Sequence, residues 1–130
     1  MSSNINTHST FTFDFILEHL FENQGRTSGV FHSLCINSHF QPIISLAHRR
    51  SVGYEALLRC TDENAQPVSP LSLFNSILSL EETIFLDRLS RAVHVANFMR
   101  ADQDGKAWLF LNLNPQVAVA GMQFGSFFEG

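Results

Sequence analysis

Two β-rich segments separated by only four residues constrain the fold of this chain more than any other feature. The first segment, residues 39–46, reads HFQPIISL, and the second, residues 51–59, reads SVGYEALLR. The short break between them, residues 47–50, reads AHRR. A parallel connection needs a crossover of a dozen or more residues, whereas a gap of this length suits a hairpin. The two segments are therefore predicted to pair as antiparallel strands. One or two strands are expected over residues 30–46, of which the segment at 39–46 is the stronger.

Apolar residues at helical spacing predict an amphipathic helix near the N-terminus. Its apolar side is formed by Phe13, Ile16, Leu17, Leu20 and Phe21. The helix is expected to end near Gly25, since glycine commonly follows a helix C-terminus. Residues 1–10 are polar and are expected to form a disordered lead-in. Core packing explains this helix most simply, and docking of a protein partner is the alternative.

The second half of the chain is predicted to contain two helices and a strand. Ser69-Pro70 is a typical helix start, with serine as the N-cap and proline at the first helical position. A longer helix is expected over about 81–101. Its predicted apolar face consists of Phe85, Leu89, Ala92, Val93, Ala96 and Met99. Residues 107–113 are nearly all apolar, which is typical of a strand buried on both faces in a parallel sheet.

Composition excludes several classes of function. The chain has 130 residues, of which 45% are hydrophobic and 15% charged, so a packed core is expected. Its net charge is −4 and its only lysine is Lys106, so neither a nucleic-acid footprint nor a polybasic membrane patch is expected. No apolar run of about 18 residues is present to span a membrane. Cys35 and Cys60 are interpreted as reduced thiols of a cytoplasmic protein.

Three polar residues lie where strands of an α/β fold usually carry their sites. Glu55 and Arg59 share one face of their strand, and Asn112 lies at the end of the next predicted strand. Carboxylate and amide oxygens suit Mg²⁺ or Mn²⁺, and a guanidinium matches a phosphate. On pattern alone, a glutamate and an arginine on one strand face more often form a surface ion pair, and an asparagine before a proline more often forms a turn.

Several short motifs resemble one family in order and spacing. They are Phe40-Gln41-Pro42-Ile43, Gly53-Tyr54-Glu55-Ala56-Leu57-Leu58-Arg59, Ser69-Pro70 with Phe74, Leu86-Asp87-Arg88 with Ala92, and Leu111-Asn112-Leu113-Asn114-Pro115. Together these motifs resemble EAL domains, the bacterial cyclic-di-GMP phosphodiesterases whose tripeptide stands here at residues 55–57. The last motif carries Asn114 where the family usually has serine.

The resemblance implies a fold and a set of roles. The expected fold is α/β, the N-terminal part of a (β/α)₈ barrel whose first strand runs antiparallel to the rest. By resemblance, Gln41 contacts the dinucleotide, Arg59 holds a phosphate, and Glu55 and Asn112 bind Mg²⁺ or Mn²⁺. The family's reaction is metal-assisted hydrolysis of cyclic-di-GMP to pGpG, within signalling that regulates biofilm formation and motility.

The resemblance covers only the first half of the family's domain. A complete barrel needs about 250 residues, and the later acidic residues and lysine of the family's site have no counterpart after Asn112. The expected organisation is a lead-in and helix over 1–29 and a truncated EAL domain over 30–130. Independent turnover is therefore not expected. Three hypotheses remain open: a truncated enzyme, a self-associating half-barrel, or a non-catalytic module that binds a protein partner.

Overall fold

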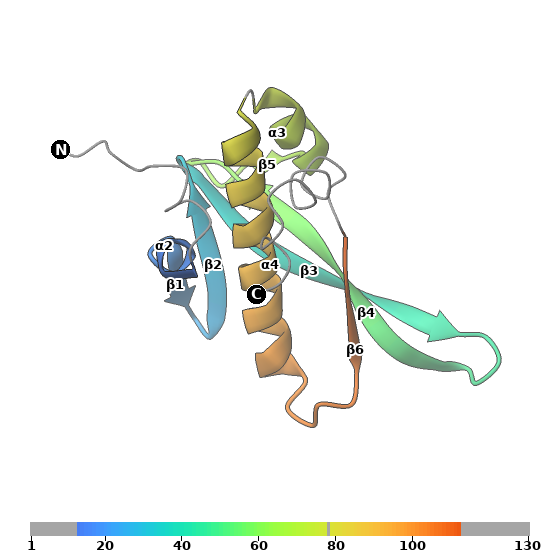
Figure 1. Ribbon diagram of the computed structural model, residues 1–130. Coiled ribbons are helices and arrows are strands. Elements are labelled where there is room, and N and C mark those ends of the chain that lie inside the picture. The colour runs from blue at the N-terminus through green and yellow to red at the C-terminus, as the bar shows by residue number, and fades with distance from the viewer. Residues whose placement is uncertain (1–12, 78, 113–130) are drawn as a thin grey trace.

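A mixed sheet of six strands with one long helix against one face forms the body of the chain (Figure 1). The computed structural model describes residues 13–77 and 79–112. The strands are β1 (Leu20–Asn23), β2 (Arg26–Phe31), β3 (Leu34–Ser45), β4 (Arg50–Thr61), β5 (Pro67–Val68) and β6 (Trp108–Leu111). The helices are α2 (Phe13–Leu17), α3 (Pro70–Ser76) and α4 (Leu80–Ala101). Strands β1 to β5 are neighbours in sequence order, and β6 pairs with β4.

This topology contradicts the predicted start of a (β/α)₈ barrel. Four of the strand pairs run antiparallel, and β4–β6 is the one parallel pair among the described residues. A barrel of that type needs a helix between successive strands. Here β1, β2, β3 and β4 are joined by tight turns instead, so the sheet continues antiparallel beyond the strand expected to be the first of the barrel.

The predicted helix over residues 13–25 is largely wrong. Helix α2 ends at Leu17, and Leu20 and Phe21 belong to β1. Gln24 and Gly25 both adopt positive φ, 54° and 79°, and Asn23 pairs with Arg26. Two positive φ angles in a two-residue loop define a tight hairpin turn. Gly25 therefore serves a β-turn rather than a helix end, and β1–β2 is a hairpin.

The predicted hairpin of β3 and β4 is confirmed. The strands pair antiparallel from Cys35–Thr61 to Ser45–Arg50, with a register shift at Ile43/Ile44. Figure 1 shows that the turn end of this hairpin extends well beyond the rest of the sheet as a projecting arm. We use "arm" below for residues 42–54.

Both predicted helices of the second half are confirmed. The Ser69 side chain accepts a hydrogen bond from the Ser72 amide, and the Ser79 side chain accepts one from the Glu82 amide. Helix α4 is followed by β6, which runs parallel to β4 as expected. The expected burial of β6 on both faces is wrong, since Trp108 and Phe110 are exposed. Residues 1–12 and 113–130, including the expected lead-in and Asn114, lie outside the described residues.

The core lies between α4 and the inner face of the sheet. Its fully buried members are Ile36, Ile84, Leu86, Leu89 and Val93. Burying each such side chain contributes about 1.5–3 kcal/mol. A Cβ atom at Gly29 would lie 3.0 Å from Leu89, so this glycine lets α4 approach β2 closely. Met99, predicted on the apolar face of the helix, is 68% exposed instead.

The two faces of the sheet differ in what they contact. On the inner face, Leu58 and Cys60 belong to the core, and Phe40 and Tyr54 pack against Phe98 of α4. Because side chains alternate along a strand, Gln41, Glu55 and Arg59 point to the opposite face. We call that side the outer face. Among the described helices, none is long and apolar enough to cross a membrane.

Candidate functional site

The outer face brings together three of the four residues predicted to form a site. Gln41 on β3 and Glu55 on β4 are direct cross-strand partners. The Cβ atoms of such a pair lie about 4.5–5.5 Å apart. Arg59 lies on the same face four residues further along β4, opposite Asn37. Gln41 and Arg59 are exposed and Glu55 is half-buried, so a ligand on this face has access to all three.

Asn37 is held in place by its neighbours beside Arg59. Its Oδ1 accepts a 2.6 Å hydrogen bond from the Ser28 hydroxyl, and its Nδ2 lies 3.3 Å from the Cys35 sulfur. Because Asn37 is the register partner of Arg59, β2, β3 and β4 contribute one continuous polar row across the outer face.

A groove of about 430 Å³ follows this polar row toward the β1–β2 turn. Its lining comprises Phe21, Asn23, Gln24, Arg26, Ser28, Cys35, Asn37, Ser38, His39 and Arg59. The Arg26 guanidinium donates a 2.9 Å hydrogen bond from Nη2 to the Ser38 carbonyl oxygen. None of these lining residues is an aspartate or glutamate, so the groove has a positive character. We call it the outer groove.

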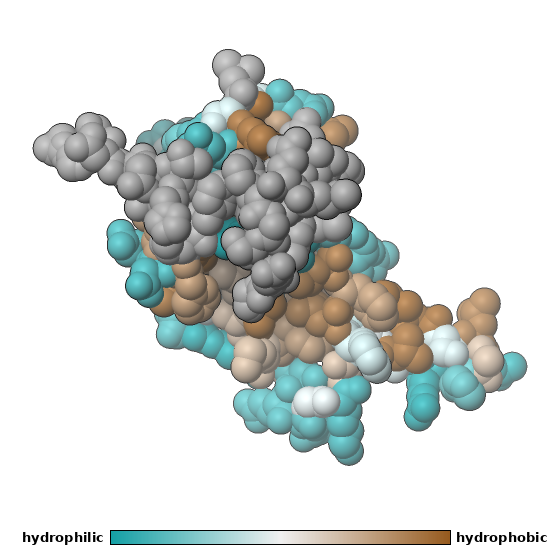
Figure 2. Space-filling view, in the orientation of Figure 1, coloured by the Kyte–Doolittle hydropathy of each residue, from teal (hydrophilic) through white to brown (hydrophobic). Residues whose placement is uncertain are grey.

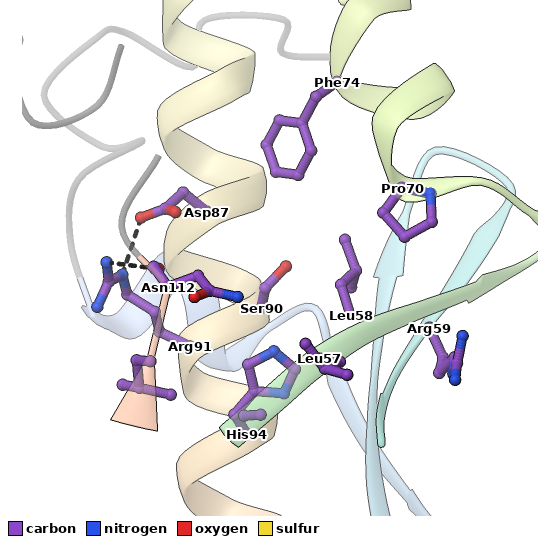
Figure 3. A pocket seen from close by; sticks show the side chains of 12 residues that line it. Leu57, Leu58, Arg59, Pro70, Phe74, Asp87, Ser90, Arg91, His94 and Asn112 are labelled. Atoms are coloured by element: carbon purple, nitrogen blue, oxygen red, sulfur yellow. Dashed lines mark hydrogen bonds and ion pairs between the residues drawn. The ribbon is translucent and has the colours of Figure 1, made fainter. Parts of the chain in front are cut away.

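A second hollow, of about 390 Å³, lies on the other side of β4, between α3, α4 and β6 (Figure 3). Here Arg91 forms an ion pair with Asp87 at 2.9 Å and donates from Nη2 to the Asn112 carbonyl oxygen at 3.2 Å. Figure 3 shows Asp87, Arg91 and His94 extending from α4 into this inner pocket, whereas Arg59 points away from α4. Arg59 therefore borders both hollows but extends toward the outer face.

The structure does not unite Glu55 and Asn112 in one hollow. Glu55 is the register partner of Phe110, and Asn112 lies two residues further along, beside the Arg91 guanidinium. A cationic neighbour disfavours a second cation, and Mg²⁺ takes about six oxygen ligands in an octahedral array. Within residues 13–77 and 79–112, no three His, Cys, Asp or Glu side chains come close enough to hold a metal ion. Glu55 and Asn112 alone do not supply such an octahedral array.

A buried polar network between α4 and the sheet was not predicted from the sequence. The Ser38 hydroxyl lies 2.6 Å from His94 Nδ1, and Asn97 Nδ2 donates to the Ser38 oxygen at 3.3 Å. Asn97 also accepts from the Thr27 amide at 2.8 Å and donates to the Thr27 carbonyl at 2.9 Å. Burial, with a smaller contribution from Arg91, lowers the pKa of His94 to about 4.

The sequence did hold a signal that α4 carries a polar stripe, to which His94 and Asn97 of this network belong. Asp87, Ser90, His94 and Asn97 recur at intervals of three or four residues on the predicted helix, which places them along one face. All four are buried. Their stripe lies beside the apolar one, so the sheet-facing side of α4 is wider than its apolar residues indicate.

Comparison of the chain with protein-family models, with curated proteins and with solved structures finds no match in any of the three. The candidate site is therefore defined by its own geometry: an exposed row of polar side chains on the outer face, next to a groove with two arginines.

Proposed function

We propose that this chain serves cyclic-di-GMP signalling as a module that binds the dinucleotide on the outer face and does not hydrolyse it. The observation that carries the proposal is the register of β3 and β4, which pairs Gln41 with Glu55 and sets Arg59 on the same exposed face. These are three of the four residues that the resemblance to EAL domains implicates in the site. Gln41 comes close to Glu55 and Arg59 because β3 pairs with β4. The motifs alone do not determine that pairing.

The chemistry of the three side chains fits a phosphodiester with attached bases. The Arg59 guanidinium can donate two parallel hydrogen bonds to one phosphate group. The Gln41 amide both donates and accepts hydrogen bonds, so it suits the polar edge of a base. Glu55 is an acceptor that repels a phosphate when it is ionised. Neutralising Glu55 should therefore strengthen binding in the absence of divalent cations.

The donor set supports the proposed absence of turnover. Hydrolysis in two-metal sites needs a clamp of ions about 3.5–4 Å apart that generates the nucleophile and stabilises the leaving oxygen. The two predicted ligands supply one carboxylate and one amide, and Asn112 lies beside the Arg91 guanidinium. The described residues offer no alternative cluster for such ions.

Isothermal titration of the 130-residue chain with cyclic-di-GMP tests the proposal. The variants Arg59→Ala and Gln41→Ala are expected to weaken binding, the arginine change by about 10-fold or more because it removes a charged donor. Arg50→Ala is the matched control, since Arg50 is an exposed arginine on the same strand beside the turn. Undetectable binding at high micromolar ligand, with and without Mg²⁺, would refute the proposal, as would equal affinities of wild type and Arg59→Ala.

A chromatographic assay for pGpG tests the second half of the proposal. Incubation of the chain with cyclic-di-GMP and Mn²⁺ is expected to leave the dinucleotide intact. Product that accumulates in proportion to protein concentration and disappears with Glu55→Gln would show that the site is catalytic after all. In the same series, Glu55→Gln without added metal is expected to bind the dinucleotide more tightly than wild type.

A second candidate function is a module that binds a protein partner. It is favoured by exposed apolar residues on the arm and on neighbouring β6, above all Leu46 at 89% and Trp108 at 70% exposure. The two candidate functions predict that binding is sensitive to substitution of different residues. Dinucleotide binding depends on Gln41 and Arg59 of the outer face, whereas partner binding depends on the apolar arm.

A further inference from the structure

Two arginines from different parts of the sheet line the outer groove. Arg59 is on β4, and Arg26 begins β2, directly after the tight turn at Gln24 and Gly25. Both are exposed, and both border the same groove of about 430 Å³. The β1–β2 hairpin thus brings a cation to the site that none of the motifs predicted.

The orientation of Arg26 is fixed by the fold. Its Nη2 atom donates to the carbonyl oxygen of Ser38, on the neighbouring strand β3, at 2.9 Å. One of the five N–H groups of the guanidinium is used in this bond, and the flat group retains its other donors. A side chain that is already ordered loses less conformational entropy when a ligand binds. Arg26 is therefore suited to hold an anion.

The rest of the lining adds hydrogen-bond donors and no negative charge. Asn23, Gln24 and Asn37 contribute amides, and His39 contributes an imidazole. The aspartates and glutamates of the described residues lie outside the lining, and Glu22 of β1 is paired with Arg100 of α4. The groove thus combines two permanent positive charges with neutral donors.

We infer that the outer groove binds a phosphate monoester, such as the terminal phosphate of a nucleotide, between Arg26 and Arg59. A monoester carries close to two negative charges at neutral pH, which two guanidinium groups balance, and its oxygens match their paired donors. Phe21, an exposed aromatic residue at the wall of the groove, offers a face on which a base can stack. This inference goes beyond the proposed function, with which it shares Arg59 alone.

The test is a calorimetric titration of the full chain with inorganic phosphate, with GMP and with guanosine. Phosphate and GMP are expected to bind, GMP the more tightly, and guanosine much more weakly than GMP. Arg26→Gln and Arg59→Gln should each weaken phosphate and GMP binding by about 10-fold or more, because each removes one charge while keeping a donor. Phe21→Ala should weaken GMP but not phosphate.

Controls separate lost binding from lost folding. Arg50→Gln makes the same chemical change on β4 outside the groove and should leave phosphate affinity unchanged. Arg26→Lys keeps the charge and should retain most of the binding. In the wild-type chain, phosphate should shift the NMR resonances of the Arg26 and Arg59 Nε–H groups, a readout that needs no variant.

The outcomes distinguish this inference from the proposed function. Failure of phosphate and GMP to bind at millimolar concentration would overturn the groove assignment, as would binding that Arg26→Gln leaves unchanged. Phosphate binding that depends on Arg26, without any binding of cyclic-di-GMP, would support the groove and refute the proposed function. Cyclic-di-GMP binding that depends on Gln41, without phosphate binding, would do the reverse.

Discussion

His94 is both buried and in contact with a serine hydroxyl, and neither property can be read from the sequence. It is 6% exposed, and its Nδ1 lies 2.6 Å from the Ser38 hydroxyl. Asn97 already donates to that hydroxyl oxygen, so the hydroxyl hydrogen is available to donate to Nδ1. Such a bond needs a neutral imidazole with its hydrogen on Nε2. The sequence does not predict this burial, because local spacing does not tell which turn of a helix meets a sheet.

The lowered pKa of His94 predicts that the chain loses stability in mild acid. The unfolded chain binds a proton at His94 near pH 6.5, whereas the folded chain does so only near its pKa of about 4. Stability from the neutral imidazole is therefore fully present above pH 6.5 and is lost as the pH falls toward 4. The loss should approach about 3 kcal/mol in the free energy of unfolding.

Urea denaturation at pH 7.5, 6, 5 and 4.5 measures this effect. The variant His94→Gln keeps an acceptor for Ser38 but cannot titrate, so the wild-type curve should fall more steeply with decreasing pH than the variant curve. Comparing the two removes the contribution of carboxylates common to both. Parallel curves would show that His94 is not the group responsible.

The two cysteines are predicted to differ in reactivity. Cys60 is buried in the core, and burial, with smaller contributions from Cys35 and Asp62, raises its pKa above the ordinary value. The thiolate is the reactive form, so Cys60 should react slowly in the folded chain. Half-buried Cys35 should react first with an aromatic disulfide reagent. Comparing Cys35→Ser with Cys60→Ser identifies each phase, and a fast phase that survives in Cys35→Ser would contradict the assignment.

At the scale of elements, local chemistry predicted helix starts and the central hairpin well. Ser69-Pro70 and the four-residue break before β4 act through neighbouring residues, so the sequence shows them directly. The helix predicted from Phe13 to Gly25 was wrong, because the apolar residues of this segment satisfy a helical spacing for two turns without forming one helix. There the turn chemistry of Gln24 and Gly25, both at positive φ, competes with helix periodicity and determines the outcome.

The N-cap of α4 supplies a measurable part of the stability of that helix. The Ser79 side chain accepts from the Glu82 amide, and its carbonyl oxygen accepts from the Thr83 hydroxyl. Ser79→Ala is expected to reduce the free energy of unfolding by about 1 kcal/mol. Ser72→Ala, at an exposed position in the first turn of α3, is the control and should be neutral or slightly stabilising. Equal melting temperatures for both variants would argue against the cap.

Gly53 is required for the contact between β4 and β6. It is the register partner of Trp108, and a Cβ atom there would lie 2.6 Å from the Trp108 carbonyl oxygen. That oxygen belongs to the backbone, so Gly53→Ala should push β6 away and destabilise the chain by about 1–3 kcal/mol. Hydrogen exchange at Leu109, Phe110 and Leu111 should accelerate. Val52→Ala, at an exposed neighbouring position, should leave this exchange unchanged; acceleration in both variants would indicate a general effect on the strand.

At the scale of the whole molecule, the order of strands was the hardest property to predict. Hydrophobic periodicity describes which residues of one segment share a face, but it does not identify the neighbouring segment. The strand at residues 39–46 was expected to begin a barrel, whereas β2 pairs with it antiparallel and extends the sheet. The outer face was nevertheless predicted in part, because Glu55 and Arg59 share a face by alternation along one strand. Their pairing with Gln41 and Asn37 required the register.

The same architecture leaves apolar residues on the arm and on β6 in contact with solvent. Figure 2 shows hydrophobic residues gathered along the projecting arm. The exposed members are Ile44, Leu46, Val52, Trp108 and Phe110. Basic residues Arg49 and Arg50 lie at the turn, whereas the chain as a whole carries a charge of −4. Attraction between the basic turn of one copy and the acidic remainder of another thus favours association, in addition to the burial of apolar surface.

This surface predicts that the chain associates with itself as its concentration rises. Burial of exposed apolar surface favours association by roughly 25 cal/mol per Å², offset by the entropy lost on binding. The variants Leu46→Ser and Trp108→Ser should therefore shift the molar mass, measured by light scattering after size-exclusion chromatography, toward that of a monomer. Met99→Ser, which changes an equally exposed residue on α4, is the control and should not. If the arm variants leave the mass unchanged while Met99→Ser reduces it, association runs through α4, and the arm is free for a protein partner.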